Sequence, residues 1–216
     1  TIGAIVGSSG LVLTEIMSKA INRPLFDILS GKSVIKMNHH YEQLSKVNIE
    51  NKEDPLIWLK QAQKIIIVPG YGMALAQAQH LVKTLFDKLD KSGCEVKFAI
   101  HPVAGRMPGH MNVLLAEAGI DYDKLYEMDD VNDEFASCDV TIIIGANDVL
   151  NPAARDAIGT PIYGMPILNV DYAPKIIICN YDTKPGYSGV ENPLYHRKEG
   201  IAFMLGDAKE TLESII

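Results

Sequence analysis

Beyond residue 63, hydrophobic residues fall into short runs, and the segments between these runs carry apolar residues at helical spacing. The runs that suit buried parallel strands are KIIIV (64–68), EVKFAI (95–100), KLYEM (124–128), VTIIIG (140–145) and KIIIC (175–179), with PILNV (166–170) as a weaker sixth. Helical patterns occupy residues 73–90, 110–118, 131–137, 150–157 and 207–215. Strands that alternate with helices predict an α/β fold, in which helices cover both faces of a doubly wound, six-stranded parallel sheet.

The first residues of the chain have a different pattern. Thr1 to Leu13 carries no charge, which is too short to span a bilayer alone because a span takes ~20 residues. Basic residues follow this run rather than precede it, so it does not have the order of a signal peptide. One interpretation is an ordinary amphipathic helix. The other is a membrane-derived segment over 1–23, the end of a transmembrane helix, with Lys19 and Arg23 on the cytoplasmic or matrix side.

A polar stretch without clear periodicity follows, from Lys32 to Pro55. Such a composition is typical of a linker, which we place at residues 24–54. A short helix is expected next, with Asp54 as its N-cap and Pro55 in its first turn. The remaining residues, 55–216, are predicted to form one domain.

Charge and cysteine content exclude several classes of function. The chain of 216 residues has a formal net charge of -7, and no basic stripe offers phosphate contacts, so nucleic acid is not expected as a partner. Cys94, Cys138 and Cys179 are far apart and odd in number. Their spacing predicts neither a metal site nor a disulfide framework.

A glycine turn follows the first predicted strand. Gly70 and Gly72 stand where a strand passes into a helix, in the first two positions of a dinucleotide-binding turn. The third position of that turn is Leu75 rather than glycine, and a lone GxG is a weak signal. The second strand ends in His101, where an ordinary NAD site has an acidic residue for the ribose hydroxyls.

The loop after His101 also combines glycines with a charge. Gly105, Arg106 and Gly109 precede a predicted helix, a setting that suits an anion with Arg106 as its phosphate partner. The alternatives are that Arg106 is a surface charge and that His101 is a turn residue with its hydrogen bonds satisfied. For the loop as a whole the anion site is favoured, and for His101 alone the structural role is favoured.

Two further segments carry polar groups that suit a ligand. Gly145 to Asp148 lies at the carboxyl end of the fourth strand, where Asn147 is able to read an amide or a ribose. Asp148 is equally able to act as the N-cap of the next helix, and the two roles can coexist. The stretch 179–193 is long and rich in Gly, Pro and Asn, which favours a functional loop, often a lid. No nucleophile–base pair stands out, so no catalytic residue is assigned, and hydride transfer needs none.

Taken together, these motifs resemble the NADP(H)-binding domain (domain III of the beta subunit) of proton-translocating nicotinamide nucleotide transhydrogenase. The resemblance rests on PGYGMA, IHPVAGRMPGHMNVLLAEA, GAND, NPAA, GMP, GYSGVENPL and GDAK, and it covers the chain from about Lys64 to the C-terminus. It implies a Rossmann-like fold that binds NADP in reversed orientation, which accounts for the missing acidic residue. Residues 55–216 then form the NADP(H)-binding domain.

The resemblance also implies partners and a location. A separate NAD(H)-binding domain or subunit docks so that hydride passes directly between the nicotinamides, and a membrane proton-channel domain couples this transfer to proton translocation. The whole enzyme is expected to be dimeric, and this domain to face the cytoplasm or the mitochondrial matrix from the membrane. The alternative function is a structural or regulatory dinucleotide-binding module, similar to FAD- or thiamine-diphosphate-associated domains.

Carried over residue by residue, the resemblance implies a set of cofactor contacts. With the glycines of the turn, these are Gly70, Tyr71, Gly72, Val103, Ala104, Gly105, Arg106, Met107, Pro108, Gly145, Ala146, Asn147, Asp148, Val149, Gly164, Met165, Asn180, Tyr181, Asp182, Thr183, Lys184, Pro185, Gly186, Tyr187, Asp207 and Ala208. Asp148 and His101 match positions linked in the family to proton coupling. Asn180 and Tyr181 stand where the family has Lys-Arg for the 2′-phosphate, so Lys184 is expected to supply part of the missing charge.

Overall fold

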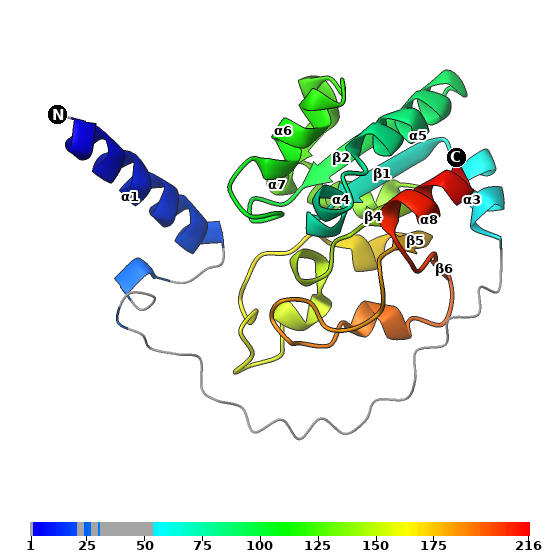
Figure 1. Ribbon diagram of the computed structural model, residues 1–216. Coiled ribbons are helices and arrows are strands. Elements are labelled where there is room, and N and C mark those ends of the chain that lie inside the picture. Colours follow the sequence, from blue (N-terminus) through cyan, green and yellow to red (C-terminus); the bar gives the residue numbers. More distant parts are fainter. Residues whose placement is uncertain (1, 21–23, 27–29, 31–53) are drawn as a thin grey trace.

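The computed structural model of the chain describes residues 2–20, 24–26, 30 and 54–216 (Figure 1). At the N-terminal end, α1 (Ile2–Ala20) agrees with the helical segment predicted there. No helix among the described residues is long and apolar enough to cross a membrane. Most of the linker predicted at 24–54 lies outside the described residues.

Six strands of the described residues form a single parallel sheet, which confirms the predicted fold class. The strands are β1 (Lys64–Pro69), β2 (Glu95–Ile100), β3 (Leu125–Glu127), β4 (Val140–Ile144), β5 (Ile176–Cys179) and β6 (Ile201–Phe203). Their order is β3-β2-β1-β4-β5-β6. Strands β2 and β3 therefore lie on one side of β1 and strands β4 to β6 on the other, which makes the boundary between β1 and β4 the topological switch point. Open parallel sheets bind ligands at the carboxyl ends of the strands beside this switch point.

The prediction of a strand at 166–170 is wrong. This segment is a loop that leads into a 3-10 helix, Val170–Tyr172, although Ile167 and Leu168 are buried. The sixth strand is β6 instead, which pairs with β5 from Ile176↔Ile201 onwards. A short apolar run does not distinguish a strand from a loop packed on the core, because both bury their side chains.

The α-helices of the folded part differ in places from the predicted ones. They are α3 (Pro55–Gln61), α4 (Tyr71–Leu75), α5 (Gln79–Lys91), α6 (His110–Glu117), α7 (Met128–Val131) and α8 (Ala208–Ile215). The expected cap of α3 is confirmed, since Leu56 N donates to Asp54 Oδ1 at 2.9 Å. The helix predicted at 73–90 is divided into α4 and α5, because Gln77 between them adopts a left-handed φ of 52°.

Two other predicted helices are 3-10 turns for the most part. At 131–137, α7 gives way to the 3-10 helix Asn132–Ser137. At 150–157 the chain forms the 3-10 helices Asp148–Leu150 and Pro152–Ala154. Pro152 has no amide hydrogen to continue a helix, and the Asn151 side chain accepts from Ala153 N at 3.0 Å, so the chain restarts here.

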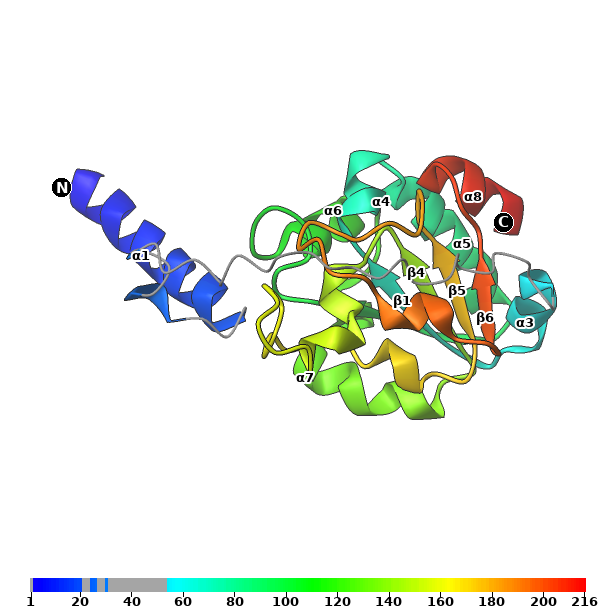
Figure 2. The same cartoon turned by 90° about the horizontal axis from the view of Figure 1, so that it is seen from below.

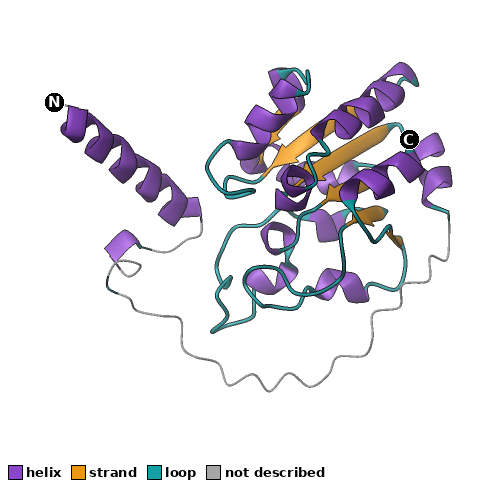
Figure 3. Cartoon of the chain, in the orientation of Figure 1, coloured by secondary structure: helices purple, strands orange, loops and turns teal. Residues whose placement is uncertain are grey.

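Helices and short turns cover the two faces of the sheet unequally. Along β1, Ile65 and Ile67 face a core shared with α3, α5, α6 and α8, whereas Ile66 and Val68 face a core shared with α7 and the 3-10 segments. Figure 2 shows these two layers on opposite sides of the strands. Figure 3 shows that long loops join the short helices of the second layer. These loops supply much of the candidate site.

Candidate functional site

Three glycines allow the loops after β1 and β4 to touch. Gly70 N donates to Ile144 O and Gly72 N donates to Gly145 O, both at 2.9 Å. A Cβ added to Gly72 would stand 2.7 Å from Gly145 Cα, and one added to Gly70 would overlap the Gly145 carbonyl oxygen. Gly145 also has a left-handed φ of 66°. The predicted glycine turn is therefore present, and its glycines serve a backbone-to-backbone contact across the switch point.

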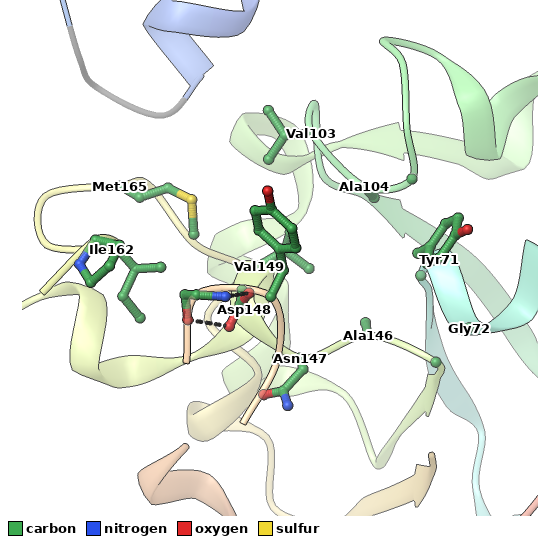
Figure 4. A pocket seen from close by; sticks show the side chains of 17 residues that line it. Tyr71, Gly72, Val103, Ala104, Ala146, Asn147, Asp148, Val149, Ile162 and Met165 are labelled. Atoms are coloured by element: carbon green, nitrogen blue, oxygen red, sulfur yellow. Dashed lines mark hydrogen bonds between the residues drawn. The ribbon is translucent and has the colours of Figure 1, made fainter. Parts of the chain in front are cut away.

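A cavity of about 720 Å³ opens where these two loops meet. It lies within the size range of small-molecule and cofactor sites. In Figure 4, Tyr71 and Gly72 lie at its right, Ile162 and Met165 at its left, Val103 and Ala104 above, and Asn147 and Asp148 below. The full lining is Gly70, Tyr71, Gly72, Val103, Ala104, Gly105, Gly145, Ala146, Asn147, Asp148, Val149, Pro161, Ile162, Met165, Gly186, Tyr187 and Ser188.

The cavity brings together much of the predicted set of contacts. Segments 70–72, 103–105 and 145–149 line it, as do Met165, Gly186 and Tyr187. Several predicted residues lie outside its lining, namely Arg106, Met107, Pro108, Gly164, Asn180, Tyr181, Asp182, Thr183, Lys184, Pro185, Asp207 and Ala208. The lining therefore matches the predicted glycine loops and only part of the predicted residues after β5.

Arg106 lies beside this cavity and stacks on Tyr71. Its guanidinium carbon is 4.6 Å from the centroid of the Tyr71 ring, a cation–π contact. Tyr71 also lines a second, neighbouring cavity of about 470 Å³, which includes Arg106 and His110. The Arg106 side chain thus stands next to the mouth of the larger cavity rather than inside it.

His101 is buried with both of its ring nitrogens satisfied. Its Nε2 is 2.8 Å from Pro166 O, and its Nδ1 accepts from Val103 N at 3.2 Å. These contacts require a neutral ring that carries its proton on Nε2, and burial lowers the pKa of His101. The imidazole joins the Val103 wall of the cavity to the segment that ends at Pro166, which agrees with the structural role favoured from the sequence.

Residues 181–192, which we call the strap, are joined by asparagine side chains to the segment that follows β4. Asn147 Nδ2 donates to Lys184 O at 3.0 Å, and Asn192 Nδ2 donates to Asn147 Oδ1 at 3.0 Å. Asn151, which is fully buried, donates to Glu191 O at 3.1 Å. The strap is therefore held through side-chain hydrogen bonds at several points along its length.

The residues directly after β5 are engaged in contacts with other parts of the protein. Asn180 is buried, and its Nδ2 donates to Ala146 O at 2.9 Å and to the Tyr195 hydroxyl at 3.0 Å. Tyr181 is 80% exposed. Lys184 is also exposed and lies 3.3 Å from Asp182 in an ion pair. Asn180 thus anchors the start of the strap, and Lys184 is the cation of this segment.

The Asp148 side chain bonds to the strap and not to the 3-10 helix Asp148–Leu150, of which Asp148 is the first residue. Ser188 N donates to Asp148 Oδ2 at 2.8 Å and Ser188 Oγ donates to Oδ1 at 2.7 Å. The N-cap position of the 3-10 helix belongs to Asn147, without a side-chain capping bond. The alternative role of Asp148 as a helix cap is therefore wrong.

Sequence reasoning missed three lining residues, Pro161, Ile162 and Ser188. The first two follow the segment 150–157, whose pattern predicts a helix, and no motif marks them as part of a loop at the switch point. Ser188 stands in a glycine-rich stretch, GYSGV, and a hydroxyl in such a loop is a signal that was available. Its contact with Asp148 joins residues 40 positions apart and is visible only in the folded chain.

Comparison with known proteins agrees with the resemblance drawn from the motifs. A family model described as "NAD(P) transhydrogenase beta subunit" matches residues 1–216. Two curated relatives from Rhodospirillum rubrum, one of them from a particular strain, are named NAD(P) transhydrogenase subunit beta; each is 47% identical over 218 residues and matches 99% of this chain. The match covers 47% of each relative, so the chain spans about half of their length. A solved structure of an exopolyphosphatase-related protein from Bacteroides fragilis is similar at 18% identity and a TM-score of 0.36, over 74% of this chain and 41% of that one.

Proposed function

Because the chain belongs to the family of NAD(P) transhydrogenase beta subunits, we propose that residues 55–216 bind NADP(H) and present its nicotinamide for direct hydride exchange with NAD(H). The observation that carries this proposal is the cavity at the switch point between β1 and β4. Dinucleotides bind at this position in open parallel sheets.

The lining of the cavity fits a dinucleotide in most respects. Its volume of about 720 Å³ is within the range of cofactor sites. Val103, Ile162 and Met165 offer apolar surface for a planar ring, and the Asn147 side chain offers polar groups for ribose or amide. Gly70 and Gly72 let the turn after β1 pass directly against Gly145, at the edge of the sheet where phosphate is approached in related folds.

Hydride transfer places few chemical demands on the chain itself. When bound, the cofactor supplies the hydride chemistry, and the protein supplies binding, orientation and exclusion of water. The role of this chain is then to hold the nicotinamide ring against the apolar side chains of the cavity, whose lining also includes Tyr71 and Tyr187. Bringing two rings into contact replaces a bimolecular encounter, which is a large part of the rate enhancement available to such a reaction.

The preference for NADP over NAD is a separate part of the proposal. A 2′-phosphate calls for Arg or Lys, and the lining of the cavity contains neither. We propose that Lys184 supplies part of this charge by leaving Asp182, since an exposed ion pair is weak. Arg106, which stacks on Tyr71 beside the cavity, is proposed to contact another phosphate of the cofactor.

The partners and the location are also proposed from the family. The relatives are about twice as long as this chain, so the parts of the enzyme that act on protons and on the membrane are expected outside the folded domain. The proposed partners are an NAD(H)-binding domain or subunit and a membrane proton-channel domain, in a dimeric enzyme with this domain on the cytoplasmic or matrix side.

One experiment separates the enzyme component from the alternative of a structural or regulatory module. The purified chain is analysed for bound nucleotide and then mixed with an NAD(H)-binding partner domain of this family. The proposal expects bound NADP(H) and hydride exchange between NAD(H) and NADP(H). Bound FAD, or NADP(H) binding without exchange, would favour a module that holds a nucleotide for structure or regulation.

A further inference from the structure

Ser188 makes three hydrogen bonds at the edge of the cavity. Its backbone amide and its hydroxyl both donate to the Asp148 carboxylate, at 2.8 and 2.7 Å. The same hydroxyl accepts from Val190 N at 3.2 Å. A hydroxyl that donates to one partner and accepts from another is confined to a single rotamer, so the contact has a defined geometry. The bond to the carboxylate is also charge-assisted, which makes it one of the stronger kinds.

The contact lies where the strap lines the cavity. The hydrogen bonds from asparagine side chains reach the strap at Lys184 and from Val190 onwards. In the described structure, the side-chain bonds that join Gly186–Ser188 to the body of the protein come from Asp148. The same carboxylate passes close to Gly186, where an added Cβ would stand 2.7 Å from Asp148 Oδ1.

Tyr187 lies between these two close contacts. Its side chain lines the cavity and is otherwise fully exposed, so the ring has little packing of its own. Its position depends on the backbone at Gly186 and Ser188, and this backbone is fastened to Asp148 below the cavity, where dashed lines mark the bonds in Figure 4. Release of the Ser188 contacts would free the part of the strap that lines the cavity.

We propose that Ser188 is a positioning residue, which fastens the strap to Asp148 and thereby sets how long NADP(H) stays bound. The inference rests on the proposed function, and it concerns the lifetime of the complex rather than the identity of the cofactor. Ser188 acts through Asp148 and Tyr187 and is not assigned a role in hydride transfer.

The test compares release and binding of NADPH in the full chain. Stopped-flow mixing measures the two rate constants for wild type, Ser188→Ala, Ser188→Thr and the control Ser137→Ala. Ser137 is a matched control because its hydroxyl also donates to a nearby oxygen, Glu134 O, and its residue does not line the cavity. Ser188→Ala is expected to release NADPH about tenfold faster, as for loss of one hydrogen bond to a charged group, with a binding rate within about twofold of wild type.

The conservative variant and a cofactor-free measurement complete the test. Ser188→Thr keeps the hydroxyl and is expected to release NADPH within about threefold of wild type, as is Ser137→Ala. Amide hydrogen exchange over 181–192 without cofactor is expected to be faster in Ser188→Ala and unchanged in Ser137→Ala.

The outcomes separate this inference from the proposed function. If wild type does not bind NADPH, the proposed function and the role of Ser188 are both overturned. If wild type binds NADPH but Ser188→Ala releases it at the wild-type rate, only the role of Ser188 is overturned. A general loss of thermal stability in Ser188→Ala, with both rate constants changed alike, also overturns a positioning role, because it indicates structural damage.

Discussion

The two rims of the cavity are built in opposite ways. On one side, Gly70 and Gly72 press directly against Gly145, so backbone meets backbone with no side chain between. On the other side, the strap is held by side chains such as Asn147 and Asp148, and most of its own residues are exposed or half-buried. Contacts between backbones in a packed core have no alternative arrangement, whereas exposed side-chain hydrogen bonds exchange readily with water. The first rim is therefore suited to a fixed cradle and the second to a part that opens.

The largest expected effect comes from breaking the glycine rim. Gly145→Ala places a Cβ against Gly72 at a left-handed φ, and should destabilise the protein by about 3 kcal/mol or more in urea unfolding. Gly93→Ala is the matched control. Gly93 has a similar φ of 85° but no atom within 4 Å of an added Cβ, so only about 1 kcal/mol is expected. Equal costs for the two variants would mean that close approach at Gly145 is not what holds this rim.

Removal of the charge beside the glycine rim comes next. Arg106→Ala should weaken NADP(H) binding by about 1.5–3 kcal/mol, because a charge-assisted contact to phosphate is lost together with the stacking on Tyr71. Calorimetric titration measures the dissociation constant. A value equal to that of wild type in a folded variant would refute Arg106 as the phosphate contact.

On the strap, the corresponding change should be smaller. Lys184→Ala should lower the ratio of NADP to NAD affinity about fivefold, because Lys184 is exposed and has to leave Asp182 before it meets a 2′-phosphate. Asp182→Asn, which frees the lysine, should raise the ratio. Titrations of both nucleotides provide the measurement. An unchanged ratio in Lys184→Ala would exclude this anchor, and a wild type that binds NAD as well as NADP would contradict the cofactor assignment.

The smallest expected effect concerns His101, which joins two walls of the cavity. Burial lowers the pKa of His101 below its ordinary value of 6.5, so the unfolded chain takes up the proton first as pH falls. Stability should therefore be unaffected above about pH 7 and should fall as pH drops below 6.5, by less than about 1 kcal/mol at pH 6. Urea unfolding of wild type and His101→Gln at pH 8 and pH 6 measures the difference. If both proteins change alike, another group carries the pH dependence.

Several features of the fold and of the candidate site could be predicted from local sequence. The isoleucine-rich runs of β1, β4 and β5 are buried on both faces, so continuous apolar stretches identified them as parallel strands. The glycines after β1 and β4 marked the edge where the cavity lies, because close approach of two backbones leaves a direct record in the sequence. The Asp54–Pro55 start of α3 was equally local.

What the tertiary structure decided depends on partners that are distant in sequence. Whether an apolar run becomes a strand depends on a free sheet edge, and β5 offers its edge to Ile201–Phe203 rather than to 166–170. Asn180 turns inward because Ala146 O and the Tyr195 hydroxyl are there to accept its amide. Ser188 meets Asp148 across 40 residues. Amino-acid type alone determines how far a residue tends to be buried and which backbone angles it tolerates, but a hydrogen bond has a short range and a strict direction, so only the folded chain determines which groups meet.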